Sequence, residues 1–314
     1  MPKIYVTLAT YNGDKYLAKM LDSLCAQTVS PAKIIAVDDG SRDTTVSILE
    51  SYKDKLPLDI YPQKENKGHR AAFSLALEIA QKEAAPDDFI ALADQDDVWL
   101  PEKLEILSRK IGGADLVFGD AEVIGKGGEK IADSWRALAG IIPHLTTSSL
   151  LTGFTDVTGC LTLFRASLLS FCLPLPRDII VHDQWIVFCA SLRNGYIPVT
   201  DKVIQYRIHD NNAIGLGTQK SWSERLAMNL QWITVIINNP LFAELSPGQQ
   251  RFAKEYKAFL FNRFHKNFRP QIIFWTWKHR KSLFPQCRTF KEFAPRALFS
   301  AIGTKPALAF FGKK

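Results

Sequence analysis

The acidic run Asp94-Gln95-Asp96-Asp97 is the densest group of chemically capable side chains, and it directly follows the apolar run Phe89–Ala93. A short apolar run bounded by polar residues predicts a buried strand. Carboxylates crowded at a strand end repel one another, and a divalent cation among them relieves that repulsion. Mg²⁺ or Mn²⁺ suits such oxygen ligands, and Mg²⁺ commonly binds one or two carboxylates together with substrate phosphates. The run therefore predicts a grip on a metal-bound diphosphate; the alternative is a solvated acidic loop in which Asp97 caps a helix.

A second polar cluster, Asp38-Asp39-Gly40-Ser41, follows the apolar run Ile34–Val37. Carboxylates there could accept hydrogen bonds from a nucleobase or a ribose, and Gly40 permits backbone angles that other residues resist. We assign Asp39 to a ligand and expect Ser41 mainly to cap the helix that begins near Thr44. The alternative is that the whole cluster only caps that helix.

A third cluster, Asn66-Lys67-Gly68-His69-Arg70, opens a segment with helical spacing. Backbone amides at a helix N-terminus favour an anion such as a phosphate, and the side chains of Lys67 and Arg70 would add positive charge. A solvated basic helix start is an equally open interpretation.

Two candidates lie later in the chain. Asp183, in the run His182-Asp183-Gln184-Trp185, opens an apolar helix and is either a functional carboxylate or the cap of that helix. His209 follows the apolar run Val203–Ile208 as a ligand or as a structural histidine. Cys160 suits packing better than chemistry.

The elements that must position these residues alternate in type. Helical spacing of apolar residues separates the successive strand-like runs, as at Leu17, Met20, Leu21 and Leu24. Strands that alternate with helices of 10 to 15 residues predict an α/β, Rossmann-like fold with a mostly parallel central sheet and flanking helices. Ligands in such sheets bind beyond the carboxyl ends of the strands, so we expect the three clusters to form one site. The expected strands are Ile4–Leu8, Ile34–Val37, Leu58–Tyr61, Phe89–Ala93 and Leu116–Phe118.

The pattern becomes less regular over residues 121–200, where Val157–Phe164 predicts a strand interrupted at Gly159-Cys160. From Trp222 onward the spacing is helical, and a second helix follows Ser246-Pro247. We therefore expect a catalytic domain over residues 1–218 and a helical C-terminal extension over 219–314.

Composition excludes several classes of protein. The chain has 314 residues, of which 46% are hydrophobic and 23% charged, as in ordinary globular proteins and unlike disordered or polytopic membrane proteins. Its N-terminus leads directly into an apolar strand, so no signal peptide is expected. Five scattered cysteines without a C-x-x-C pair indicate reduced thiols in a cytoplasmic protein.

Four motifs, in this order and spacing, resemble family 2 glycosyltransferases, which have the GT-A fold. They are Thr10-Tyr11-Asn12-Gly13, Val37-Asp38-Asp39-Gly40-Ser41, Asn66-Lys67-Gly68 and the stretch Asp94–Leu104. The resemblance covers about residues 3–215. The form of the acidic run, together with His182–Trp185 and Tyr206–His209, most resembles the rhamnosyltransferase-like branch of bacterial surface-polysaccharide biosynthesis.

This resemblance implies roles for individual residues. Asp39 would contact the nucleotide base and Asp94 the ribose, Asp96 would bind the metal on the diphosphate, and His209 would join it. Asp183 aligns with the general base of the family, although Gln184 departs from the Trp or Glu of many relatives. The full set of residues expected to bind the donor is Thr10, Tyr11, Asp39, Asn66, Lys67, Arg70 and Asp94.

The activity implied is that of an inverting, metal-dependent hexosyltransferase with a nucleotide-diphosphate sugar as donor, dTDP-rhamnose being favoured over a UDP-hexose. The cofactor would be Mn²⁺ or Mg²⁺, and the acceptor a glycan or a lipid-linked glycan. Two alternatives remain: a haloacid-dehalogenase-type phosphohydrolase, whose acidic loop should instead follow the first strand, and a non-catalytic nucleotide-sugar-binding protein.

The end of the chain differs from the rest in charge. From Arg263 to Lys314 there are twelve Lys or Arg and a single acid, Glu292, interleaved with aromatic residues. Such a pattern favours an anionic membrane surface, which would make the enzyme peripheral at the cytoplasmic face of the bacterial plasma membrane. The alternative is packing on the catalytic domain or on a second copy in a homo-oligomer; nucleic acid is not the expected partner.

Overall fold

The computed structural model describes residues 2–141, 145–209, 221–264, 271–287 and 289–302. The chain divides into two compact units. The first consists of residues 1–144, 157–175 and 181–217, and the second of residues 145–156, 176–180 and 218–314. Two short segments that the sequence grouped with the first 218 residues therefore belong to the second unit.

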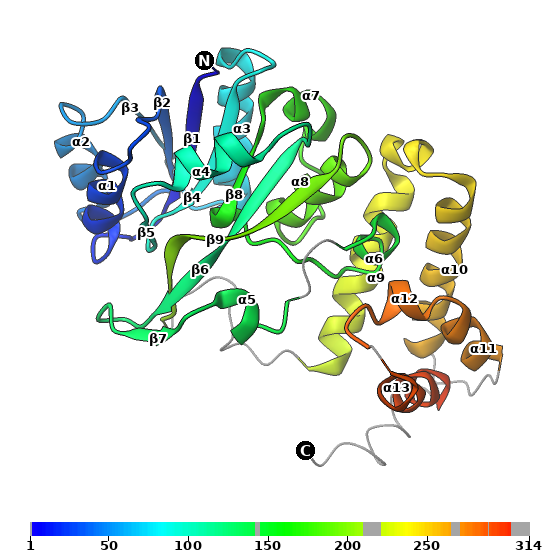
Figure 1. Ribbon diagram of the computed structural model, residues 1–314. Helices are drawn as coiled ribbons and strands as arrows, with labels where there is room; N and C mark the ends of the chain where they lie inside the picture. Colours follow the sequence, from blue (N-terminus) through cyan, green and yellow to red (C-terminus); the bar gives the residue numbers. More distant parts are fainter. Residues whose placement is uncertain (1, 142–144, 210–220, 265–270, 288, 303–314) are drawn as a thin grey trace. The chain divides into compact units, whose positions relative to one another are not determined.

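The first unit is built on a sheet whose first half is parallel (Figure 1). The strands β1 (Ile4–Thr10), β2 (Lys33–Asp38), β3 (Leu58–Pro62) and β4 (Phe89–Asp94) lie in the order β3-β2-β1-β4. Each contains the run expected to be a strand. The residues of β1, β2 and β4 are almost all buried, as in a sheet covered on both faces, whereas in β3 only Leu58 is buried.

The second half of the sheet corrects the expectation of a mostly parallel arrangement. β8 (Thr162–Arg165) pairs antiparallel with β4 and with β6 (Leu116–Ile124), and β9 (Tyr196–Arg207) runs parallel to β6. The short strands β5 (Val98–Trp99) and β7 (Lys130–Ala132) pair antiparallel with β9 and β6. No long helix lies between β6 and β8 among the described residues, so the chain reverses direction there without the crossover that parallel pairing needs.

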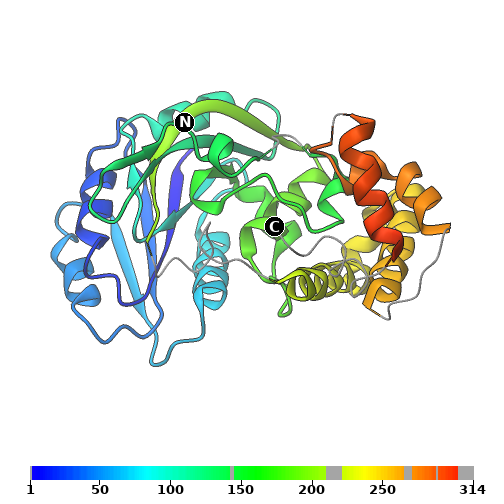
Figure 2. The ribbon, with the colours of Figure 1, turned by 90° about the horizontal axis from the view of Figure 1, so that it is seen from below.

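Helices cover both faces of the parallel half (Figure 2). α1 (Leu17–Cys25) and α2 (Thr45–Ser51) lie on one face and α3 (His69–Glu83) on the other. The chain crosses the sheet one way from β1 to β3 and returns from β3 to β4, so right-handed crossovers place these helices on opposite faces. The apolar residues of α1 are buried at the expected spacing. α4 (Lys103–Lys110) packs on the mixed half, and α7 (Leu169–Cys172) and α8 (His182–Ser191) pack on α3. The short α5 (Trp135–Leu138) lies beside β6.

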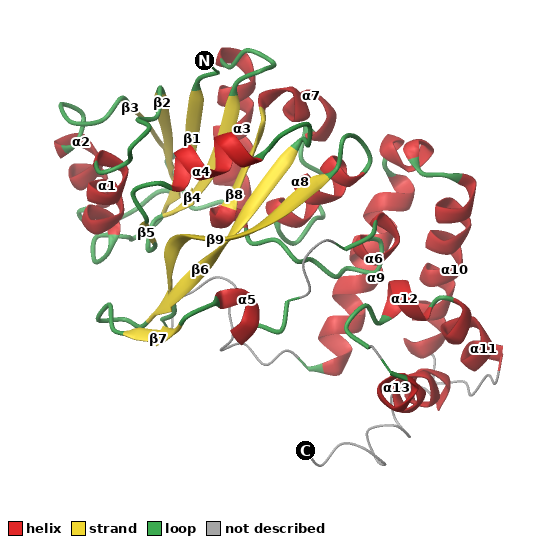
Figure 3. Cartoon of the chain, viewed as in Figure 1, coloured by secondary structure: helices red, strands yellow, loops and turns green. Residues whose placement is uncertain are grey.

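The second unit is helical, whereas the strands all belong to the first (Figure 3). Its helices are α6 (Thr147–Leu150), α9 (Trp222–Asn238), α10 (Pro247–Phe264), α11 (Gln271–Lys278), α12 (Arg280–Leu283) and α13 (Phe290–Ile302). α9 begins with a reciprocal capping box between Ser221 and Glu224 and packs along α10. Among the described residues, no helix has both the length and the apolar character to cross a membrane.

Candidate active site

The strand register brings the polar clusters to one edge of the sheet. Thr10, at the end of β1, lies opposite Asp38 on β2, while Ala9 lies opposite Asp94 on β4. The carboxyl ends of three neighbouring parallel strands therefore meet, which is where open α/β sheets bind ligands.

The corner between β1 and β2 is held by its own side chains. The buried Thr10 hydroxyl donates to Asp38 Oδ1 (2.9 Å), so Thr10 supports the site from beneath. The expectation that Ser41 caps α2 is wrong, because its hydroxyl donates to Asp38 and accepts from the Asn12 amide. The side chain of Gln95 holds the partly exposed Tyr11 by both backbone groups, at 2.9 and 3.0 Å.

Asp39 is buried and its carboxylate faces the loop before α3. The backbone amides of Lys67 and Gly68 donate to its two oxygens at 2.8 and 2.7 Å. Gly40 makes this approach possible: its φ is +77°, and a Cβ there would lie 2.9 Å from the carbonyl carbon of Glu65. The second and third clusters are thus one hydrogen-bonded unit.

The remaining residues of the third cluster lie at the start of α3. Asn66 accepts from the Gly68 amide at 3.1 Å, and Lys67 is exposed, with its ammonium 3.6 Å from Glu65. Arg70 is half-buried in the first turn of the helix. Lys67 therefore extends into solvent in this state of the site.

Asp94 carries the strongest sign that the acids converge. Burial, together with the negative charges of Asp96 and Asp183, raises its pKa to about 7. Since electrostatic influence of this kind requires proximity, three carboxylates from the acidic run and from α8 share one neighbourhood.

Asp96 and His209, the two residues expected to hold a metal, lie in direct contact. The Nε2 atom of His209 is 2.7 Å from Asp96 Oδ2, and both side chains are largely buried. The buried Arg207 fixes the pair, because its amide donates to Asp97 Oδ1 (2.9 Å) and its Nε to the Asp96 carbonyl (2.8 Å). A carboxylate and an imidazole at this spacing are a donor set that fits a divalent transition metal.

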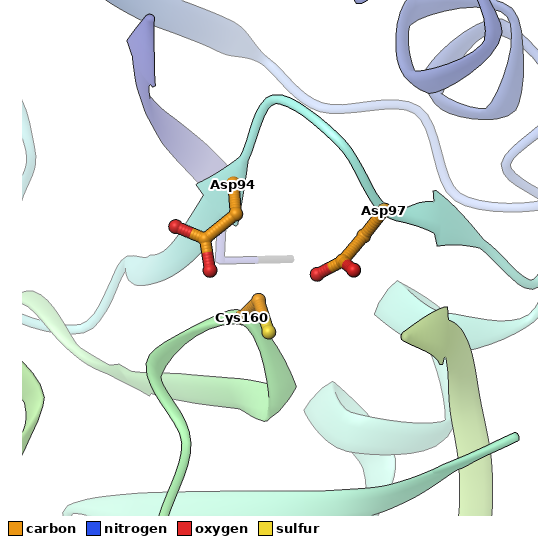
Figure 4. Close-up of side chains that lie close together, drawn as sticks. All are labelled: Asp94, Asp97 and Cys160. Atoms are coloured by element: carbon orange, nitrogen blue, oxygen red, sulfur yellow. The ribbon is translucent and has the colours of Figure 1, made fainter. Parts of the chain in front are cut away.

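Asp97 is buried and takes no part in capping α4, whose N-cap is Glu102, so the alternative of a helix cap is wrong. One carboxylate oxygen of Asp97, one of Asp94 and the sulfur of Cys160 all lie within 4.8 Å of one another (Figure 4). Burial and the two carboxylates raise the pKa of Cys160 well above its usual value. The thiol is therefore protonated at neutral pH.

Lys103 explains how such an acidic group can be buried. Its ammonium, fully enclosed, donates to the Cys160 carbonyl at 2.6 Å and lies 3.2 Å from the centre of the Trp99 ring. Burial lowers its pKa to about 7, while Cys160, Asp97 and Asp94 act in the opposite direction. The cation thus partly balances the carboxylates and ties α4 to the Gly159–Leu161 turn.

That turn also holds Asp183. The Gly159 amide donates to Asp183 Oδ2 (2.9 Å), and the Gln184 amide donates to Oδ1 (2.6 Å). Burial raises the pKa of Asp183 to about 6, and these donors oppose the rise. Asp183 lies in the first turn of α8 and the N-cap is Val181, so the capping alternative is not what the structure has.

His182 adjoins Asp183 inside the fold. Its ring stacks on Phe73 of α3 at 3.9 Å, and burial lowers its pKa to about 3, so the imidazole is neutral. His69, whose ring centre is 6.2 Å away, lies near Asp39 as well. The two histidines lie between the neighbourhood of Asp39 and that of Asp183.

Sequence reasoning missed Gln95, Lys103 and Arg207 as parts of the site. Each lies inside a quoted motif, yet each acts through backbone groups that are distant in sequence. A buried Lys or Arg is rare unless it is paired. The presence of Lys103 and Arg207 among the apolar residues of their motifs was therefore the sequence signal that they have partners in the site.

The family model described as glycosyl transferase family 2 matches residues 5–172. An uncharacterized glycosyltransferase of Nostoc sp. is 27% identical over 67% of this chain and 66% of its own length. The uncharacterized glycosyltransferase YwdF of Bacillus subtilis is 34% identical over 39% of this chain and 43% of its own. The chain thus matches less than two thirds of the length of these relatives.

Two solved structures share the fold. Staphylococcus aureus TarS, in complex with UDP-GlcNAc, superposes with a TM-score of 0.59 at 19% identity, over 98% of this chain and 83% of the other. Mannosyltransferase PcManGT from Pyrobaculum calidifontis, in complex with GDP-Man and Mn²⁺, has a TM-score of 0.52 at 18% identity, over 100% and 88%. At these identities the likeness concerns the fold, which is that of GT-A enzymes.

Proposed function

Because this chain belongs to glycosyl transferase family 2, we propose that it moves a sugar from a nucleotide-diphosphate donor to an acceptor hydroxyl, with inversion at the anomeric carbon. The observation that carries the proposal is that the acidic run and Asp183 meet at the Gly159–Leu161 turn: Asp94 lies beside the Cys160 thiol, and the Gly159 amide donates to Asp183. A donor-binding pair of carboxylates beside a third, separately held carboxylate is the arrangement that such a transfer needs.

Donor recognition would begin at the edge formed by β1, β2 and α3. Asp39 would bind the base, since each of its oxygens can accept a second hydrogen bond besides those from Lys67 and Gly68. Asp94 would bind the ribose, Thr10 and Tyr11 would line the nucleotide, and the Asn66–Arg70 segment would face the phosphates. Lys67 and Arg70 would supply the positive charge.

Asp96 and His209 would hold the divalent cation. A bound cation stabilises the negative charge that grows on the diphosphate as the sugar leaves. Because Mg²⁺ prefers oxygen ligands alone, an imidazole in the set favours Mn²⁺. Arg207 would keep Asp96 in place, since its Nε donates to the backbone carbonyl of Asp96.

Asp183 would accept the proton of the acceptor hydroxyl. A carboxyl group with a pKa raised to about 6 is ionised at neutral pH and is a stronger base than an ordinary aspartate. The Gly159 and Gln184 amides orient the carboxylate, and attack opposite the leaving diphosphate gives inversion.

The finer assignments extend this proposal. The branch-level motifs favour dTDP-rhamnose over a UDP-hexose as donor. We propose a glycan or a lipid-linked glycan as acceptor, with the enzyme peripheral at the cytoplasmic face of the plasma membrane. The second compact unit is proposed to serve membrane or homo-oligomer contacts, and no nucleic acid partner is proposed.

The structure gives no support to a haloacid-dehalogenase-type phosphohydrolase. Its nucleophile loop should follow the first strand, whereas the acidic run here follows β4. A non-catalytic binding protein would have no need to hold Asp183 by two backbone amides. Transfer is therefore favoured over both alternatives.

The test is a panel of nucleotide sugars, assayed for donor turnover and by calorimetry with Mn²⁺ or Mg²⁺. Asp183→Asn should lower turnover about 10²- to 10⁴-fold and leave nucleotide affinity unchanged, since the base acts only in the transition state. Asp96→Ala should abolish the metal-dependent part of nucleotide binding.

An exposed carboxylate outside the site, Asp87→Asn, is the control and should retain full turnover and binding. Turnover that survives in Asp183→Asn would remove the base assignment. Nucleotide binding that ignores both the metal and Asp96→Ala would remove the metal assignment.

A further inference from the structure

Helix α11 has apolar side chains on two faces. Its inner face buries Ile272 and Thr276, and Trp275 stacks on Phe252 and Phe259 of α10. The Trp275 indole also donates to Glu255 Oε2 at 2.8 Å. This inner face is sufficient to hold α11 on the unit, so the outer face needs a separate explanation.

The outer face exposes large apolar side chains. Phe274 is 74% exposed, Trp277 is 41% exposed, and Phe290 at the start of α13 is 65% exposed. Phe274 and Trp277 are one turn apart, and the rings of Trp277 and Phe290 lie 5.6 Å apart. We call these three residues the aromatic patch. Exposed apolar groups gathered in one place, unlike single ones, mark an interaction surface.

Positive charge surrounds the aromatic patch. Between residues 271 and 302 the chain has six Lys or Arg and one acid, Glu292. Lys278, Lys281 and Lys291 are exposed and lie within four residues of a patch aromatic in the sequence, and the Arg280 guanidinium lies 4.7 Å from the centre of the Trp277 ring. We call these four cations the basic rim.

We propose that the aromatic patch docks on an anionic lipid bilayer, with Phe274, Trp277 and Phe290 in the interface and the lysines at the headgroups. Aromatic rings prefer the boundary between headgroups and acyl chains, and each basic residue near an anionic surface adds about 1 kcal/mol of attraction. Lipid phosphates supply the anions that the rim lacks within the described part of its own unit.

A second copy of the chain fits this surface less well. Two such patches brought together would oppose lysine with lysine around the aromatic centre, and like charges at an interface cost several kcal/mol. An anionic bilayer satisfies both the apolar centre and the basic rim. The inference extends the membrane location suggested for the proposed enzyme by assigning its residues, but it does not depend on the sugar transferred.

Trp277 allows a direct test with the full chain. The protein is mixed with phosphatidylcholine vesicles that contain about 30% phosphatidylglycerol, with and without lipids brominated in their acyl chains. Docking should shift the fluorescence to shorter wavelength and let the bromines quench it. Trp277→Phe identifies the signal among the seven tryptophans and should remove most of the quenching.

Two sets of variants separate the contributions. Phe274→Ser with Phe290→Ser should weaken vesicle partition at least tenfold, and Lys278→Glu with Lys281→Glu should weaken it by a similar factor that high salt removes. The matched control is Phe261→Ser on α10, where another exposed phenylalanine (55%) lies outside the patch. All variants should keep the wild-type melting temperature.

Three results would overturn the proposal: equal partition of the Phe274/Phe290 variant and the wild type, no quenching of Trp277, or loss of self-association without loss of vesicle binding in the patch variants. Turnover with a soluble acceptor, measured without vesicles, is expected to be unchanged in these variants. Failure of the enzymatic proposal would appear in that assay, and failure of the docking proposal only in the vesicle assays.

Discussion

At the scale of single residues, the carboxylates of the candidate site differ in their hydrogen-bond partners. Asp39 is satisfied by two backbone amides, Asp96 contacts an imidazole, and Asp183 is held by amides from two elements. These different surroundings suit the three roles proposed for them, which are base recognition, metal binding and proton transfer.

The pKa of Asp183 predicts the pH dependence of transfer. Burial raises that pKa to about 6, so the carboxyl is protonated and inactive as a base below this pH. We expect kcat to rise about tenfold per pH unit up to pH 6 and to level off above pH 7. Steady-state rates from pH 4.5 to 8.5 at saturating donor and metal measure this.

The Asp183→Asn variant provides the control, since its residual rate should lack the rise up to pH 6. A rate that is flat between pH 5 and 8 would show that another group accepts the proton.

At the scale of elements, the site depends on loops that approach one another closely. Gly40 and Gly195 have nearly the same left-handed φ, +77° and +79°, but only Gly40 has backbone within 3 Å of the place of a Cβ. Gly40→Ala and Gly195→Ala should each cost about 1 kcal/mol of stability from the left-handed conformation.

Only Gly40→Ala should also weaken nucleotide binding, because it displaces the loop whose amides hold Asp39. Thermal unfolding and calorimetry measure the two effects separately. Equal nucleotide affinities in the two variants would mean that the Asp39 loop is not part of the donor site.

The link between α4 and the Gly159–Leu161 turn has its own prediction. Lys103→Met removes the buried ammonium and leaves the Cys160 carbonyl without its donor, which should cost about 1–3 kcal/mol. Lys110 is on the same helix, and its ammonium forms an exposed ion pair with Asp201 of β9. Lys110→Met removes this pair and should cost less than about 1 kcal/mol. Urea unfolding of the two variants measures the difference, and similar values would show that the buried cation contributes no more than a surface one.

At the scale of the whole molecule, donor and metal should stabilise the folded chain together. Ligand at a hundred times its dissociation constant adds about 2.7 kcal/mol to the free energy of unfolding. We expect a melting temperature several degrees higher with nucleotide and Mn²⁺, and loss of that increase on addition of a chelator. A nucleotide effect that persists in the chelator would contradict binding through Asp96 and His209.

The sequence by itself determined the local chemistry and the βαβ beginning of the fold. The apolar runs that became β1 to β4 are continuous and followed by polar residues, so the meeting of their carboxyl ends follows from the alternation of strands and helices. The family resemblance implies that Asp96 and His209 bind one metal, and in the structure their side chains are in contact.

Only the tertiary structure decided what depends on contacts between distant segments. The antiparallel direction of β8 and the position of Lys103 beside the acidic run leave no periodic trace, because each results from contacts with residues more than 40 positions away. The pattern also does not tell which aromatics of α11 face outward. Ser41 shows the same limit on a small scale. A serine before a helix predicts a cap, but the hydroxyl of Ser41 donates to the buried carboxylate of Asp38 instead. Local pattern sets what a residue can do, and the partners that the fold brings to it decide which of those things it does.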